Sequence, residues 1–401
     1  MVVPEGWEVK LLGDIGYFSK GQGINRDNMH SGAIPCIRYG EIYTHHNNYI
    51  KKFYSHISIE VSKDSRKLRT GELLFAASGE TKEDIGKCVA FIDNCEAYAG
   101  SDIIIFTPET DINSLFLGYY LNSEYVKHQK SSKGQGDAIV HILAHSLAEI
   151  MILLPPLPEQ LRIAEVLSDT DLYITTLERL IAKKEAVKQG VMQELLTGKR
   201  RLPGFKGEWV EKRLGEIGYT YSGLSGKQKH DFGVGNAQYI TFLNVLSNTV
   251  IDTSILERVT ISTSEKQNVV QCGDIFFNTS SETPEEVGIG SVYLGNQEVY
   301  LNSFCFGIHI TNIQKVFSSY LSYYISTTQF RKFIYPFAQG STRFNLCKAD
   351  FEKSKFKLPS LENQKRIYES LKCLSGKVAA EDAILKQYHS QKQYLLRQMF
   401  I

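Results

Sequence analysis

Polar side chains recur at equivalent positions in two loops of the chain. The segment GELLFAASGETKEDIGK from Gly71 matches GDIFFNTSSETPEEVGI from Gly273, at an offset of 202 residues. Each segment runs from an apolar stretch into a polar loop. The residues shared by the loops are Ser78, Glu80 and Thr81 in the first copy and Ser280, Glu282 and Thr283 in the second. Such side chains can hydrogen-bond base edges or phosphates, so these six residues are candidate nucleic-acid contacts.

A glycine turn between Gln339 and Leu346 presents further donors and acceptors. Its candidate contacts are Gln339, Ser341, Thr342, Arg343 and Asn345. The first half has a weaker counterpart, Gln135 to Ile142, in which His141 and Ile142 replace the Arg-Phe-Asn-Leu pattern; there we select Gln135 and the nearby Lys133. Gly136 and Gly340 themselves are interpreted as turn-forming residues of the framework.

The remaining candidates come from positions at which the two halves differ or lie close to such positions. Lys20 is opposite Ser222, Arg26 opposite Gln228, Arg38 opposite Thr241, and Glu41 opposite Asn244. A shared scaffold with different polar side chains is expected of two readers of different targets, although drift on a solvated surface gives the same pattern. The candidates in this group are Lys20, Arg26, Arg38, Lys227, Gln228 and Asn244.

Catalytic motifs are missing from the sequence. It contains no GxxxxGK[ST] phosphate loop, no Asn-Pro-Pro-aromatic tetrad, no GxGxxG opening a helix and no HExxH. His141 and His145 are four residues apart but have no third ligand, so they are interpreted as structural histidines. We therefore predict no catalytic residue, no metal site and no cofactor on this chain.

The element that positions these loops is a long helix between the prolines at 155, 156 and 158 and Gly198. Alternating steps of four and three along it give ten positions, of which seven are apolar. That spacing is typical of a coiled-coil seam. The apolar residues selected from it are Ile163, Leu167, Ile174, Leu177, Ile181 and Leu195.

A second helix with the same pattern follows Leu358 to Arg366. Each of its ten seam positions lies 204 residues after its counterpart in the first helix, and eight of them are apolar. The residues selected are Ile367, Leu371, Leu374, Val378, Leu385 and Leu395. Because the loops and the helices repeat at nearly the same offset, the protein is an internal duplication.

Within each half, short apolar runs such as IPCIRY, ELLFAAS and DIIIFT, separated by Gly, Asp and Asn, predict the strands of a mixed sheet. The fold class is therefore α/β (α+β), with each half a globule followed by its long helix. The predicted boundaries are a first globular domain at 1–156, a helix at 157–197, a linker at 198–205, a second globular domain at 206–359 and a helix at 360–401.

Bulk properties restrict the class of protein. The 401 residues include 42% hydrophobic and 22% charged residues, which is globular composition. The net charge of +1 lacks the basic excess of a protein that grips DNA alone. Seven scattered cysteines without a CxxC pair predict reduced thiols. Without a long apolar run or a leader-like start, we expect a cytoplasmic protein that binds no membrane.

Taken together, the motifs resemble those of the specificity subunit of type I restriction-modification systems. The resemblance covers essentially the whole chain, and its most specific parts are Leu154-Pro155 to Ile163, Glu194 to Gly198, Gly207 to Gly218 and Gln339 to Leu346. It implies two target-recognition domains that each read half of an asymmetric bipartite site in double-stranded DNA. It also implies that the two helices form an antiparallel coiled coil related by a pseudo-twofold.

The same resemblance implies partner subunits. The helices would dock two methyltransferase subunits, and restriction subunits would join that complex. S-adenosylmethionine, Mg and ATP are then expected on those partners, which accounts for the missing motifs. Two alternatives remain at this point: a coiled-coil scaffold without DNA readout, and a self-contained DNA methyltransferase or nuclease.

Overall fold

The computed structural model describes residues 3–109, 111–136, 139–346, 348–352 and 355–400. They form two compact units, each built from one globule and one part of each long helix. The first unit comprises Met1–Glu178 with Ala383–Ile401, and the second comprises Arg179–Asp382. Among the described residues no helix is long and apolar enough to cross a membrane.

The centre of the first unit is an antiparallel sheet in the order β2-β10-β6-β8. Its strands are β2 (Gly16–Lys20), β10 (Ile103–Pro108), β6 (Leu73–Ala76) and β8 (Cys88–Ala90). The runs IIIF and LLFA are apolar at every position because both faces of the sheet are covered. Phe75 and Phe106 pack into the core beside the long helices, whereas Leu74 and Ile105 pack into a second core on the opposite face.

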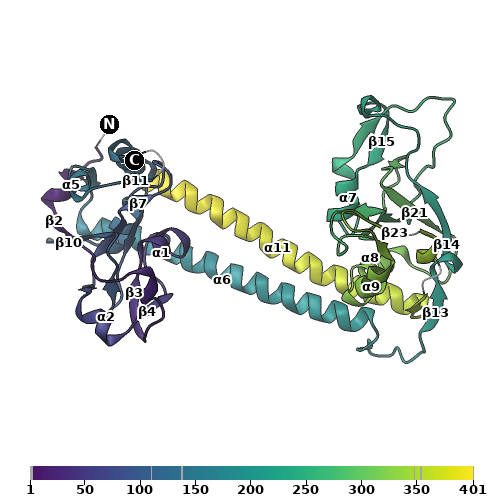
Figure 1. The fold of residues 1–401 in the computed structure, drawn as a ribbon, viewed down its shortest axis with the longest axis horizontal. Coiled ribbons are helices and arrows are strands. Elements are labelled where there is room, and N and C mark those ends of the chain that lie inside the picture. Colours follow the sequence, from purple (N-terminus) through teal and green to yellow (C-terminus); the bar gives the residue numbers. More distant parts are fainter. Residues whose placement is uncertain (1–2, 110, 137–138, 347, 353–354, 401) are drawn as a thin grey trace. The chain divides into compact units, whose positions relative to one another are not determined.

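Smaller elements of the first unit surround this sheet (Figure 1). A second sheet has the order β4-β3-β9-β5, and two-stranded ladders join β1 to β12 and β7 to β11. The further strands are β1 (Glu8–Leu11), β3 (Ile34–Ile37), β4 (Ser55–Ile57), β5 (Arg66–Lys67), β7 (Ser78–Gly79), β9 (Tyr98–Ala99), β11 (Val140–His141) and β12 (Met151–Leu154). The short helices are η1 (Leu12–Asp14), η2 (Arg26–Asn28), α1 (Tyr39–Thr44), α2 (Ile59–Lys63), α3 (Ser114–Tyr120), α4 (Glu124–Lys133) and α5 (Ala144–Ala148).

The second unit repeats this plan, with a central sheet in the order β14-β21-β17-β19. Its other sheets are β16-β15-β20, β18-β23-β22 and β13-β24. The strands are β13 (Val210–Arg213), β14 (Gly218–Ser222), β15 (Phe232–Ile240), β16 (Glu257–Val259), β17 (Ile275–Asn278), β18 (Ser280–Ser281), β19 (Gly290–Val292), β20 (Tyr300–Leu301), β21 (Cys305–Ile310), β22 (Ala338–Gln339), β23 (Phe344–Leu346) and β24 (Lys355–Leu358). The short helices are η3 (Leu214–Glu216), η4 (Lys229–Asp231), α7 (Phe242–Ser247), η5 (Thr253–Ile255), α8 (Ser318–Ile325), α9 (Thr328–Ile334), η6 (Tyr335–Phe337) and α10 (Lys348–Glu352). The mixed α/β fold and the duplication predicted from the sequence are confirmed.

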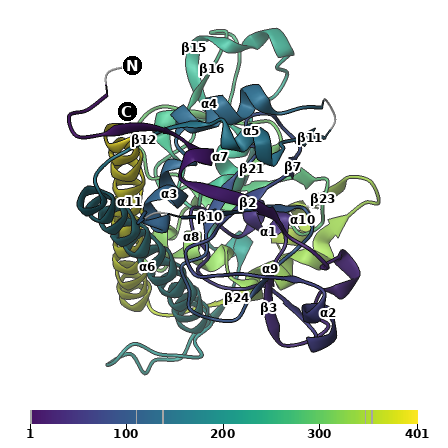
Figure 2. The same cartoon turned by 90° about the vertical axis from the view of Figure 1, so that its left-hand side faces the viewer.

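The two long helices are α6 (Leu157–Leu196) and α11 (Leu361–Met399). Figure 2 shows them side by side at one flank of the first unit, where Ile163 and Leu167 share a core with Leu395. In the second unit, Leu195 shares a core with Ile367. All twelve residues selected for the seam are buried or half-buried, so the predicted antiparallel coiled coil is confirmed within each unit.

Polar pairs interrupt the apolar seam. In the first unit, Lys392 of α11 lies 2.5 Å from a carboxylate oxygen of Asp171 on α6, and the Tyr119 hydroxyl donates to the other oxygen at 2.7 Å. In the second unit, Lys184 of α6 pairs with Glu381 of α11. The pair of Asp171 and Lys392 is mostly buried and is satisfied in one alignment of the two helices, so it favours one register of α6 against α11. The Lys184 side chain is 40% exposed, so its pair with Glu381 contributes less.

A buried glutamine fastens the start of each long helix to its globule. The Gln160 carbonyl accepts from the Asn113 amide at 3.0 Å, and its amide donates to Pro155 O at 2.8 Å. Gln364, 204 residues later, accepts from the Phe317 amide at 2.9 Å and donates to Pro359 O at 2.9 Å. Gln160 and Gln364 therefore make equivalent contacts, and each joins the start of its long helix to the globule of its own half.

Replacing Gln364 by leucine is expected to destabilise the second unit by about 2–4 kcal/mol, because the buried backbone groups of Phe317 and Pro359 lose their partner. Urea unfolding measures the change. Lys365→Leu, at the exposed neighbouring position, is the matched control and should leave the free energy of unfolding nearly unchanged. Equal stability of the two variants would mean that the glutamine contributes nothing to the attachment.

Candidate nucleic-acid interface

The two polar loops occupy equivalent places in the two units. Residues 78–86 follow β6, and residues 280–288 follow β17. Each loop begins with a short strand that pairs with a later hairpin strand, β7 with β11 and β18 with β23. Each ends in a glycine with left-handed backbone, Gly86 at φ 67° and Gly288 at φ 69°. The sequence similarity of the loops therefore reflects a common backbone structure.

The glycine turns next to these loops also have a common structure. Gly136 has φ 109° and Gly340 has φ 141°, values that favour glycine. A Cβ atom would lie 2.2 Å from Ile139 O at Gly136 and 2.0 Å from Arg343 O at Gly340. This supports their interpretation as framework residues. Asp137 and Ala138, in the first of these turns, lie outside the described residues.

His141, which the sequence suggested as a structural histidine, is the structural counterpart of the candidate contact Asn345. Gln135 forms a bridge to His141 just as Gln339 pairs with Asn345. The Ser78 hydroxyl lies 2.9 Å from His141 Nδ1, and Ser280 pairs with Asn345 in the ladder. The offset of 204 residues between His141 and Asn345 was the available signal. The two units thus present an imidazole and an amide at the same place.

Most loop candidates have exposed side chains. In the first unit Glu80, Thr81 and Gln135 are exposed and Ser78 is half-buried. In the second unit Ser280 is buried, and the exposed candidates are Glu282, Thr283, Gln339, Ser341, Thr342, Arg343 and Asn345. The Arg343 guanidinium lies over the ring of Phe304 at 5.6 Å. Lys20, Arg26 and Gln228 are exposed on other parts of their units, and Arg38 is half-buried.

Asn244 does not fit the assignment that the sequence suggested. Its side chain is fully buried, its amide donates to Asp252 O at 2.9 Å, and its carbonyl accepts from the Asp252 amide at 3.1 Å. Glu41, its counterpart, is also buried and accepts from the Ser55 hydroxyl, and burial raises the pKa of its carboxyl. These residues hold the segment after α7 and α1 in place, and Asn244 has no surface left for a base.

Two predicted lysine contacts already have carboxylate partners. Lys227 lies 2.5 Å from Glu265, and only 4% of its side chain is exposed. Lys133 lies 2.5 Å from Glu149, with 26% of its side chain exposed. Lys227 therefore forms a structural ion pair and is not available to contact a phosphate, because Glu265 neutralises its ammonium and the side chain is buried.

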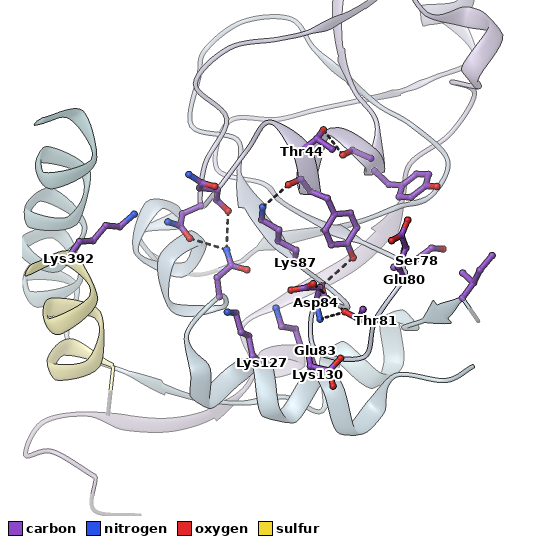
Figure 3. Close-up of a pocket in the computed structure, with 18 residues that line it drawn as sticks. Thr44, Ser78, Glu80, Thr81, Glu83, Asp84, Lys87, Lys127, Lys130 and Lys392 are labelled. Atoms are coloured by element: carbon purple, nitrogen blue, oxygen red, sulfur yellow. Dashed lines mark hydrogen bonds between the residues drawn. The ribbon is translucent and has the colours of Figure 1, made fainter. Parts of the chain in front are cut away.

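A pocket of about 990 Å³ in the first unit lies beside the loop at 78–86 (Figure 3). Tyr39 and Tyr43 come from α1, Asp84 from the loop and Lys130 from α4. Lys87, which also lines the pocket, donates to His46 O at 2.7 Å, and burial lowers the pKa of its ammonium. Aromatic, amide and charged groups of both signs surround the space, so it suits polar recognition.

The described residues contain no group of three or more His, Cys, Asp or Glu side chains that could hold a metal ion. The contact between Ser78 and His141 resembles a nucleophile with its base. Within the described part of the chain, however, no carboxylate hydrogen-bonds to His141 to orient it. The described residues around Ser78 therefore do not form a catalytic triad.

Two copies of one α/β unit, each presenting the same loop and hairpin, define an internally duplicated protein whose hairpins differ at His141 and Asn345. The family model for the type I restriction modification DNA specificity domain matches residues 4–189 and 206–387. The chain therefore belongs to the type I restriction modification DNA specificity domain family.

Named relatives agree with this assignment. The chain is 24% identical over 418 residues to a putative type I restriction enzyme MjaX specificity subunit of Methanocaldococcus jannaschii, a match that covers 98% of this chain and 92% of the relative. It is 25% identical over 305 residues to the type I restriction enzyme EcoKI specificity subunit of Escherichia coli, covering 72% of this chain and 64% of the relative.

Solved structures show the same fold. The S subunit of a type I restriction-modification system from M. genitalium matches with a TM-score of 0.58 at 14% identity and covers 100% of this chain and 98% of its own. A chain from a structure of type I restriction-modification complex assembly and conformational transition matches with a TM-score of 0.61 at 17% identity, covering 100% and 99%.

Proposed function

We propose that this chain reads the two halves of an asymmetric bipartite DNA site, one half with each unit. The observation that carries the proposal is that the two units share one loop and hairpin backbone, with the same Ser, Glu and Thr in the loop but different side chains on the paired hairpin strand. His141 and Asn345 stand at the same place, and hydrogen-bonding side chains of different shape select different base edges. Arg343 and Asn345 offer bidentate groups for guanine and adenine in the second half-site.

The chain alone grips DNA weakly in this proposal. Its net charge is +1, and Lys133 and Lys227 are engaged in ion pairs. Affinity for a duplex depends largely on contacts between basic side chains and phosphates. The partner subunits would therefore supply much of the phosphate contact, while this chain supplies the choice of sequence.

The long helices carry exposed apolar side chains that suit protein partners. On α6, Leu172 is 62% exposed in the first unit and Val187 is 53% exposed in the second. Neither is a seam residue, so α11 leaves them uncovered. We assign this side of α6 to the docking of two methyltransferase subunits, which restriction subunits then join; S-adenosylmethionine, Mg and ATP would be bound by those partners.

Because the sequence contains no Asn-Pro-Pro-aromatic tetrad, the purified chain is expected to transfer no methyl group. Adenine methylation should appear only when a methyltransferase partner is added. Incorporation of labelled methyl from S-adenosylmethionine into duplex DNA measures this. The partner alone is the control, and methyl transfer by the isolated chain would contradict the proposal and favour a self-contained methyltransferase.

Methylome sequencing of cells that carry the chain with its methyltransferase tests the reading function directly. We expect one methylated motif made of two short specific parts separated by unspecified bases. A coiled-coil scaffold without DNA readout would leave the methylation pattern independent of this chain. Deleting the chain while keeping the methyltransferase is the matched comparison.

A further inference from the structure

We propose that Lys130 and Arg331 are positioning residues that hold the backbone of the two polar loops in one shape. Lys130 acts on residues 78–86 and Arg331 on residues 280–288. The inference rests on the proposed reading function of these loops. Neither residue touches a base in this scheme. Each holds the carbonyl groups of a loop in place, so that the exposed side chains of that loop meet the DNA in one geometry.

The contacts are made to the same point of each loop. Lys130 Nζ donates to Gly86 O and to Leu121 O, both at 2.8 Å. Arg331 donates to Gly288 O at 2.7 Å through one nitrogen, and to Glu285 O at 2.5 Å and Val287 O at 2.7 Å through the other. Gly86 and Gly288 are equivalent, so a cation fastens the same carbonyl in both units.

The two cations come from different positions of the equivalent helices α4 and α9. Arg331 corresponds to Lys127, at an offset of 204 residues, whereas Lys130 corresponds to Ile334. The donor is thus displaced by about one helical turn between the units while its target carbonyl stays the same. Two different side-chain arrangements produce one contact, which indicates that the contact itself is what each unit requires.

Packing alone does not account for a lysine at position 130. Its side chain is 2% exposed, and burial lowers the pKa of its ammonium to about 8. Both of its hydrogen-bond partners are backbone carbonyls, although the charge of Asp84 in the loop favours the ammonium. A buried ammonium without a carboxylate hydrogen bond is costly, and an apolar side chain of equal length would avoid that cost. The loop contact is the compensating interaction.

The loop itself transmits the constraint to its exposed residues. Thr81 donates through its hydroxyl to Asp84 at 3.2 Å and accepts from the Asp84 amide at 3.3 Å. In the second unit the Ser281 hydroxyl donates to Glu286 at 2.6 Å. These internal contacts connect the anchored end of each loop to Thr81 in the first unit and to Ser281, next to Glu282, in the second. Releasing the anchored carbonyl would let the tip adopt several arrangements.

The test uses the chain assembled with its methyltransferase and duplexes carrying the site found by methylome sequencing. We measure the ratio of affinities for the intact duplex and for duplexes with one altered base pair in either half-site. Lys130→Met is expected to lower the ratio at least tenfold for the first half-site and to leave the second unchanged. Arg331→Met is expected to give the reverse. Lys63→Met and Lys332→Met, at exposed positions of the two units, are controls.

Readouts beside affinity separate positioning from general stability. Hydrogen exchange should accelerate in residues 78–86 of Lys130→Met and in 280–288 of Arg331→Met, with the central strands unchanged. Lys130→Gln and Arg331→Lys retain a donor and serve if the methionine variants fail to fold; each should show a smaller loss. A lowered melting temperature with unchanged ratios would overturn the proposal. A wild-type complex without preference for any duplex would instead refute the reading function.

Discussion

Exchanging residues 206–359 for the same region of another specificity subunit is expected to change one half of the methylated motif completely and to leave the other half and the spacer unchanged. The physical reason is that the second globule has its own sheets and cores, so its loops do not depend on the first globule. Methylome sequencing of cells carrying the exchanged chain measures both halves of the motif at once.

The boundary of the exchange follows from the β13-β24 ladder. Val210 pairs with Leu358, which is buried. An exchanged segment that ended before Leu358 would therefore take β13 from one protein and part of β24 from the other. The exchanged region must also pack against Leu195 and Ile367, because the helices of the recipient chain contribute these two residues to the second core. The reciprocal exchange of the first globule is the control. A change in both half-sites after either exchange would refute independent readers.

The long helices and the duplication could be predicted because their signals are periodic and repeated. Seam residues such as Leu167 and Leu371 recur at coiled-coil spacing, and that spacing alone determines which side of a helix is buried. The matching offset supplied a second, independent check. The strands of the central sheets were equally visible, because runs such as IIIF and LLFA are buried on both faces.

The candidate site could be predicted only in part, because single polar residues give no period. Asn244 looked like a variable polar tip, but its amide is satisfied by Asp252, eight residues further along the chain. Lys227 looked like a free cation, but Glu265 covers it. Such pairings depend on how loops fold back in space. In the sequence Lys130 is one of three lysines close together, and nothing in that pattern indicates that its side chain is buried against the loop at 78–86.

The C-terminal end of α6 is packed into the core of the second unit. Leu195 and Leu196 are 3% and 0% exposed in the core of the second unit. An insertion between Leu195 and Thr197 would therefore displace core residues and would not simply lengthen the helix. Changes in helix length belong in the middle of the seam, between Glu185 and Ala186 on α6 and between Ala379 and Ala380 on α11. Both points lie just beyond the pair of Lys184 and Glu381, on the side of Leu195 and Ile367.

Matched insertions of three heptads into both helices are expected to lengthen the spacer of the methylated motif by about nine base pairs. Twenty-one residues add about 31 Å of helix, and base pairs are spaced by about 3.4 Å. Nine base pairs are close to one turn of about 10.5, so the second reader meets nearly the same face of the duplex. The half-site sequences should stay unchanged, because neither globule is altered.

A single heptad in both helices is the informative comparison. It adds about 10 Å, equivalent to about three base pairs, which turn the duplex by about 100°. The helix drifts by only about 20° per heptad, so the second reader would face the wrong side of the DNA and methylation should fall at least tenfold. A heptad in α6 alone should abolish methylation, because with the second unit in place it shifts Asp171 of α6 by one heptad relative to its partner Lys392 of α11. If the three-heptad protein kept the original spacer with full activity, the helices would not set the distance between half-sites.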